Sequence, residues 1–107
     1  MEQQAAAFPP PSEESWTAFE GYLSGSLLGA QIERVIDERD PGTERFGFRI
    51  KLGDEVHGVR VRHEFWRDIT APHIRTALSV SRLADEIRDH DNVTIVMEAG
   101  TPAIRSS

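Results

Sequence analysis

Residues 45–65 read RFGFRIKLGDEVHGVRVRHEF, and this stretch decides the fold. Apolar and polar residues alternate on both sides of Gly53-Asp54, a dipeptide typical of the tight turn between two antiparallel strands. Strands at 45–52 and 56–65 that pair about this turn place one apolar set on a common face, which fixes their register. The expected pairs are Phe46 with Val61, Phe48 with Val59, and Ile50 with His57.

The opposite face of this hairpin gathers basic side chains, although the chain has a formal net charge of −6. Arginine binds carboxylate and phosphate oxygens through paired hydrogen bonds, so this face is a candidate anion-binding surface. The alternative is that Glu33 and Asp37 of a neighbouring strand neutralise it. Trp66 is the candidate aromatic residue beside it. Arg45, Arg49, Lys51, Arg60 and Arg62 are termed the basic stripe, and the predicted binding residues are Arg45, Arg49, Arg60, Arg62 and Trp66.

Residues 27–38 fit either a strand or a continuation of the first helix, because four of their apolar residues also match helical spacing. We favour the strand, since the turn sequence Asp40-Pro41-Gly42-Thr43 follows it. A strand also sets two acidic residues opposite the basic stripe, which stabilises the pairing. The strand interpretation has one unfavourable consequence, because it directs the charged side chain of Arg34 toward the core face. The expected charged pairs are Asp37 with Arg45 and Glu33 with Arg49.

Helices are predicted on both sides of these strands. Ser12 is a good N-cap for a first helix that ends near Ser24-Gly25-Ser26. A second helix runs from Thr70 to near His90, with an apolar stripe along one side. The run Val93–Met97 is β-branched and apolar, which is typical of a buried strand.

We therefore expect an α+β fold in the order helix, three-stranded antiparallel meander, second helix and fourth strand, with the helices on one face of the sheet. The single domain covers residues 12–99, after a disordered Ala/Pro-rich tail over 1–11 and before a loose C-terminal end over 100–107. The fourth strand can pair either with the first strand or with 56–65. The predicted core residues are Phe46, Phe48, Ile50, Val59, Val61, Leu83, Ile87 and Ile95.

Composition narrows the class of protein. The 107 residues include no cysteine, which excludes disulfides and thiolate metal sites and fits a cytoplasmic protein. No signal peptide or membrane-length apolar run is present, so we expect a soluble protein with no membrane association. The acidic balance makes a nucleic-acid partner improbable. Eleven arginines against one lysine indicate a bacterial or phage source.

Catalytic and metal motifs are sparse. His63, Glu64, Asp68 and His73 could converge at the corner between the second long strand and the second helix, with ligand types that suit zinc or iron. Their spacing matches no metal motif, and a phosphate-binding loop and a nucleophile elbow are absent. We expect a strand-end and helix-cap cluster there, with no cofactor.

These observations favour a small acidic non-catalytic binding or adaptor protein, and the alternative is a small enzyme or metalloprotein that uses the histidine and carboxylate cluster. The expected partner is another protein. A homodimer is also expected, through the exposed edge of strand 56–65 if the fourth strand pairs with the first strand. If the fourth strand pairs with 56–65, this edge is covered, and the protein is a monomer or a dimer through another surface. The element order is similar to that of the small acidic chaperones that escort bacterial secretion effectors, which pair as homodimers. This similarity of layout implies a chaperone-like or regulatory role.

Overall fold

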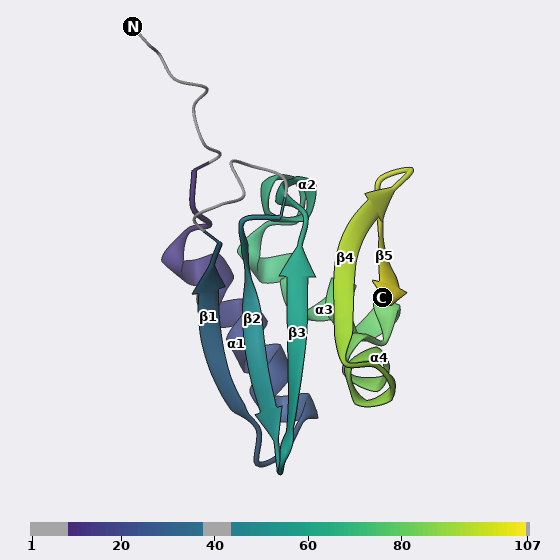
Figure 1. Ribbon diagram of the computed structural model, residues 1–107. Helices are drawn as coiled ribbons and strands as arrows, with labels where there is room; N and C mark the ends of the chain where they lie inside the picture. Colours follow the sequence, from purple (N-terminus) through teal and green to yellow (C-terminus); the bar gives the residue numbers. More distant parts are fainter. Residues whose placement is uncertain (1–8, 38–43, 107) are drawn as a thin grey trace, which may run out of the picture.

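The structure is a computed structural model that describes residues 9–37 and 44–106. Within these residues, five strands form one mixed sheet in the order β1-β2-β3-β4-β5, and four helices lie on one face of it (Figure 1). The α+β class is confirmed, with one strand and two helices more than predicted. The elements are α1 (Glu13–Ser26), β1 (Gln31–Ile36), β2 (Phe46–Leu52), β3 (Glu55–Val61), α2 (His63–Asp68), α3 (Ala71–Ser81), α4 (Leu83–Asp89), β4 (Asn92–Glu98) and β5 (Thr101–Ser106).

The β2–β3 hairpin has the register predicted from the sequence. Phe46 lies opposite Val61, and Phe48 lies opposite Val59. Gly53 in the connecting turn has a φ of +61°, a left-handed conformation that glycine adopts at little cost. The turn chemistry and the alternation of apolar residues therefore agree on one pairing.

β1 confirms the strand interpretation of residues 27–38. It pairs antiparallel with β2 and sets Glu33 opposite Arg49. The backbone nitrogen of Asp37 donates to the carbonyl oxygen of Arg45 at 2.8 Å, so these two residues lie opposite each other as the expected register requires. Arg34 points toward the helices as predicted, where acidic side chains of α1 receive it. The predicted turn at 40–43 lies outside the described residues.

α1 begins where its capping residue predicts. The hydroxyl oxygen of Ser12 accepts a hydrogen bond from the backbone nitrogen of Ser15 at 3.2 Å. The helix continues to Ser26, close to the predicted end. Residues 1–8 of the predicted tail lie outside the described part of the chain.

The chain between β3 and β4 folds into three short helices, so the prediction of a single second helix is wrong. β3 stops at Val61, and α2 begins at His63. Continuation of the strand would send Phe65 and Trp66 to opposite faces of the sheet, whereas α2 packs both against the helix-side core. Arg82, with a φ of +60°, then separates α3 from α4.

β4 pairs in parallel with β3, which is one of the two pairings that the sequence allowed. This pairing covers the edge of β3 that was expected to form the homodimer interface, so the prediction of that interface is wrong. β5 returns antiparallel along β4 and sets Ile104 opposite Ile95. The prediction of a loose end is therefore also wrong for residues 101–106, and the sheet has five strands rather than four.

The core lies between the sheet and the helices. All eight predicted core residues are buried, and aromatic side chains of α1 join them. The ring centroids of Phe19 and Phe48 are 4.5 Å apart, and this aromatic contact packs α1 against β2. The hydroxyl of Tyr22 accepts a hydrogen bond from the backbone nitrogen of Ala84 at 3.0 Å and ties α1 to the start of α4. Within the described residues, no helix has both the length and the apolar character needed to cross a membrane.

Candidate functional site

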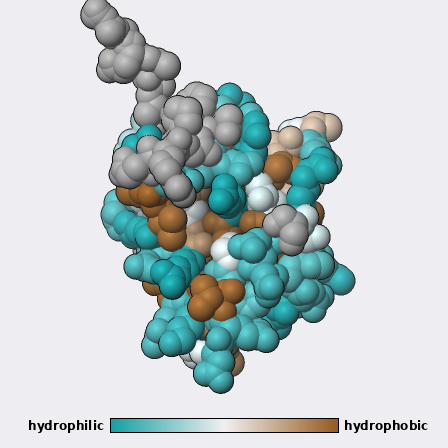
Figure 2. All heavy atoms as spheres, in the orientation of Figure 1, coloured by the Kyte–Doolittle hydropathy of each residue, from teal (hydrophilic) through white to brown (hydrophobic). Residues whose placement is uncertain are grey.

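No described helix covers the sheet face opposite α1–α4 (Figure 1). Strand alternation places Arg49, Lys51 and Arg60 of the basic stripe on this open face. Alternation along β2 and β3 sends the residues between the buried ones to this side. Figure 2 views this face and shows separate hydrophobic patches among hydrophilic side chains. The residues of β2 and β3 that face this side are Gly47, Arg49, Lys51, Val56, Gly58 and Arg60.

A hollow of about 540 Å³ opens on this face, and two glycines help to form it. A Cβ atom on Gly47 would lie 2.2 Å from the backbone oxygen of Val59, and one on Gly58 would lie 2.6 Å from Oδ1 of Asn92. A side chain at either position would therefore displace its neighbours and narrow the hollow. Its described lining is Val35, Ile36, Asp37, Glu44, Arg45, Gly47, Phe48, Arg49, Gly58, Val59, Arg60 and Asn92.

Arg49 and Arg60 are the accessible cations of the hollow. Their side chains are 64% and 61% exposed. Among the described residues, Arg49 lies 4.0 Å from the carboxylate of Glu33, and Arg60 lies 3.8 Å from that of Glu44. Ion pairs this long and this exposed contribute at most about 1 kcal/mol. Both guanidinium groups can therefore turn to an external anion at small cost.

Arg45 and Arg62, the other predicted binding arginines, have structural contacts. Arg62 donates from Nε and Nη2 to the two carboxylate oxygens of Glu64, at 3.2 Å and 3.3 Å. These hydrogen bonds hold the pKa of Glu64 below its usual value. The guanidinium of Arg45 lies 5.8 Å from the ring centre of Phe46. The structure thus divides the predicted site into two accessible arginines and two that stabilise the end of the sheet.

Trp66 does not lie beside the arginines, so its predicted place on the open face is wrong. It belongs to α2 and packs on the helix side, with ring centroids 5.2 Å from Trp16 and 5.4 Å from Phe19. The helix that follows Val61 turns this side chain across to the core.

The histidine and carboxylate cluster comes together only in part, with His63 near Glu64 and Asp68. His73 is hydrogen-bonded through Nδ1 to the hydroxyl of Thr70 at 3.0 Å. Asp68 accepts from Nε of Arg67 at 2.6 Å, and this contact lowers the pKa of Asp68. Nδ1 of His63 lies 3.8 Å from Glu64. Over residues 9–37 and 44–106, no group of three or more His, Cys, Asp or Glu side chains is placed to hold a metal ion.

A second hollow, which sequence reasoning missed, lies on the helix side at the N-terminal end of α1. Its volume is about 950 Å³. Nε1 of Trp66, at its wall, is buried without a hydrogen-bond partner among the described residues. In the sequence, this hollow is indicated only by proline and aromatic residues close to the start of the first helix. The described lining is Pro9, Pro10, Pro11, Ser12, Glu14, Ser15, Phe46, His63, Trp66, Arg67, Thr70, Ala71 and Pro72.

Comparison of the chain with protein-family models, with curated proteins and with solved structures finds no significant match. The chemistry of the surfaces therefore carries the functional argument. The open face offers two exposed guanidinium groups over a glycine-lined hollow, an arrangement suited to binding carboxylates.

Proposed function

We propose that this protein is a small non-catalytic adaptor that binds an acidic segment of a partner protein on the open face of its sheet. The observation that carries the proposal is the pair of accessible arginines, Arg49 and Arg60, at the glycine-lined hollow. Guanidinium groups bind carboxylates bidentately, and a segment with several carboxylates could engage both arginines at once.

Two features favour an acidic polypeptide over a nucleic acid. The positive charge of the hollow is local, because Glu33, Asp37 and Glu44 interrupt it at the margins, whereas a nucleic-acid backbone is bound along a continuous basic surface. The described strand residues that face this side include no aromatic side chain on which a base could stack.

The enzyme alternative has less support. The described lining of the hollow includes the carboxylates of Asp37 and Glu44, but it contains no Ser, Thr, Cys or His side chain with which they could form a nucleophile–base pair. In the histidine and carboxylate cluster, Asp68 is hydrogen-bonded to Arg67 and His73 to Thr70, and no three described His, Cys, Asp or Glu side chains are placed to hold a metal ion. A cytoplasmic location, a homodimer and a chaperone-like role stay predictions from the sequence.

The test is binding of a fluorescein-labelled hexaglutamate peptide, followed by fluorescence anisotropy at low salt. The protein is acidic overall, so affinity for this peptide must come from a local basic site. We expect the double variant Arg49→Glu/Arg60→Glu to weaken binding at least tenfold, and 0.5 M NaCl to weaken it in the wild type.

Arg82→Glu is the matched control, because it reverses one exposed arginine on the helix side. It should change the affinity less than twofold, and thermal unfolding should show that all variants fold. Equal weakening by Arg82→Glu and by the double variant, or no binding by the wild type, would rule out the open face as the site.

A further inference from the structure

The outer edge of β1 presents backbone groups that no other part of the described chain uses. The backbone hydrogen bond between Asp37 and Arg45 shows that they form a hydrogen-bonded pair of the ladder. Every second residue of β1, counted back from Asp37, therefore directs its backbone N–H and C=O groups toward β2. The residues between them, Ile32, Arg34 and Ile36, direct their N–H and C=O groups outward. None of these six groups has a partner within the described residues.

The opposite edge of the sheet is protected. Ala99 and Gly100 have φ values of +53° and +79° and form a two-residue turn between β4 and β5. Thr101 therefore pairs inward with Glu98, and Pro102 faces outward. Proline has no N–H, so it interrupts this edge as a template for another strand. β1 contains no proline, so its outer edge can pair with another strand.

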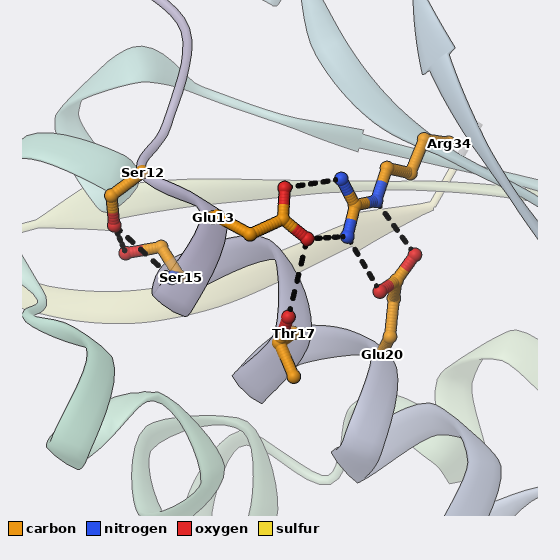
Figure 3. A network of polar contacts seen from close by, with 6 residues as sticks. All are labelled: Ser12, Glu13, Ser15, Thr17, Glu20 and Arg34. Carbon is orange, nitrogen blue, oxygen red and sulfur yellow. Dashed lines mark hydrogen bonds and ion pairs between the residues drawn. The ribbon is translucent and has the colours of Figure 1, made fainter.

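The side chains beside the β1 edge have a defined charge. Arg34 donates from Nε to Glu20 at 2.8 Å and from Nη2 to Glu13 at 2.7 Å, as Figure 3 shows. Its guanidinium carbon also lies 5.1 Å from the ring centre of Trp16. One arginine thus meets two carboxylates, and the cluster has a net charge of −1. The side chain of Glu13 is 73% exposed, so part of this negative charge faces solvent.

We propose that the free edge of β1 binds an extended basic segment of a partner protein, which adds a sixth strand to the sheet. The segment carries the pattern apolar–x–basic–x–apolar. Its basic side chain lies opposite Arg34, beside Glu13 and Glu20, and its apolar side chains lie against Ile32 and Ile36. Main-chain hydrogen bonds supply affinity and the alternate side chains supply specificity. This surface shares Ile36 with the lining of the hollow, but it uses the outer backbone edge of β1 and neither Arg49 nor Arg60.

Charge selects this partner over a second copy of the chain. Full antiparallel pairing of two β1 edges would set Arg34 opposite Arg34 of the other copy. It would bring two clusters together, each with a net charge of −1, and the like charges would repel. A basic side chain from a different protein also lies opposite Arg34, but the carboxylates of Glu13 and Glu20 outnumber that one positive charge, so the cluster attracts it. Ile36 is 49% exposed and provides apolar surface for its neighbour.

Two synthetic peptides test the proposal, the acetylated and amidated sequences TVTKTVT and TVTETVT. They differ only in the residue that would lie beside Glu13 and Glu20. We expect the lysine peptide to bind at least fivefold more tightly in an NMR titration of isotope-labelled protein. The amide signals of Ile32, Arg34 and Ile36 should move most. The proposal would be overturned by equal affinities of the two peptides or by no binding of the lysine peptide. Signal shifts confined to β5, or to the residues around Arg49 and Arg60, would also overturn it.

A pair of proline variants tests the role of the backbone edge. Ile36→Pro removes one outward N–H of β1, and Ser106→Pro removes one from the outer edge of β5. We expect the first to weaken binding of the lysine peptide at least tenfold and the second to leave it unchanged. The variant Arg49→Glu/Arg60→Glu should also leave it unchanged, which separates this surface from the proposed acidic-segment site. A dimer in sedimentation that Ile36→Pro abolishes would instead identify a second copy as the occupant.

Discussion

The two faces of the sheet are built from the same strands, yet different forces constrain them. On the helix side, Phe48 is 2% exposed and Ile50 is fully buried. On the open side, the side chain of Arg49, between them in sequence, is 64% exposed. Neighbours within the chain determine which residues fit the covered face. No described helix or strand packs on the open face, so packing among the described residues places fewer limits on its composition.

The largest expected effect tests this contrast within one strand. Phe48→Ala should lower the free energy of unfolding by about 3–5 kcal/mol, because it leaves a cavity among the aromatic rings of the core. Arg49→Ala, one residue further along, should change it by less than about 0.5 kcal/mol. Urea unfolding at 25 °C measures both. Similar losses for the two variants would contradict the assignment of the two faces.

The glycines of the open face form the next comparison. Gly47→Ala should cost about 1–3 kcal/mol, since its new Cβ meets the backbone oxygen of Val59, which is fixed by the sheet. Gly58→Ala should cost less, because the side chain of Asn92 can rotate away. The same unfolding experiment ranks the two variants. A larger loss for Gly58→Ala would show that the sheet backbone yields more easily than this asparagine.

Arg34 gives the smallest effect and the only one that depends on pH. Arg34→Met should lower stability at pH 7 by about 1 kcal/mol, as expected for a partly exposed cation with two carboxylate partners. Hydrogen bonds from Arg34 lower the pKa of Glu13 from its usual 4.5. This contribution is therefore present above pH 4.5 and is lost as the pH falls through the lower folded-state pKa.

The variant should accordingly lose less stability than the wild type between pH 5 and pH 3, although the pairs of Arg62 with Glu64 and Arg67 with Asp68 still titrate there. Arg49→Met is the control, because the ion pair that Arg49 makes with a described carboxylate, that of Glu33, is long and exposed. Parallel acid unfolding profiles for Arg34→Met and the wild type would exclude the predicted linkage.

The register of the meander could be predicted because two independent signals agree there. Apolar alternation sets the face, and Gly53-Asp54 sets the turn, so Phe48 and Val59 have one possible pairing. β1 was ambiguous by periodicity, and charge resolved it through Glu33 and Arg49. Arg34 seemed a cost of that interpretation, because its partners come from a helix fourteen or more residues earlier.

Features that depend on distant packing could not be predicted in the same way. His63–Asp68 has no strong helix signal, and it is helical because only a helix brings Trp66 to Trp16 and Phe19. This error also misplaced one residue of the predicted site. β5 was missed because Pro102 resembles a terminator, yet it faces the outer edge, where a missing N–H breaks no bond within the sheet.

The parallel contact of β3 with β4 has a consequence for the order of folding. The two strands share four Cα pairs, Gly58–Val61 with Asn92–Ile95, and about thirty residues of helical chain separate them. The short turns of the hairpins close quickly, whereas this long loop must close at a larger entropic cost. We expect the seam between β3 and β4 to form last and to open first. Amide hydrogens of Gly58 and Arg62, which bond across it, should then exchange with solvent before those between β2 and β3.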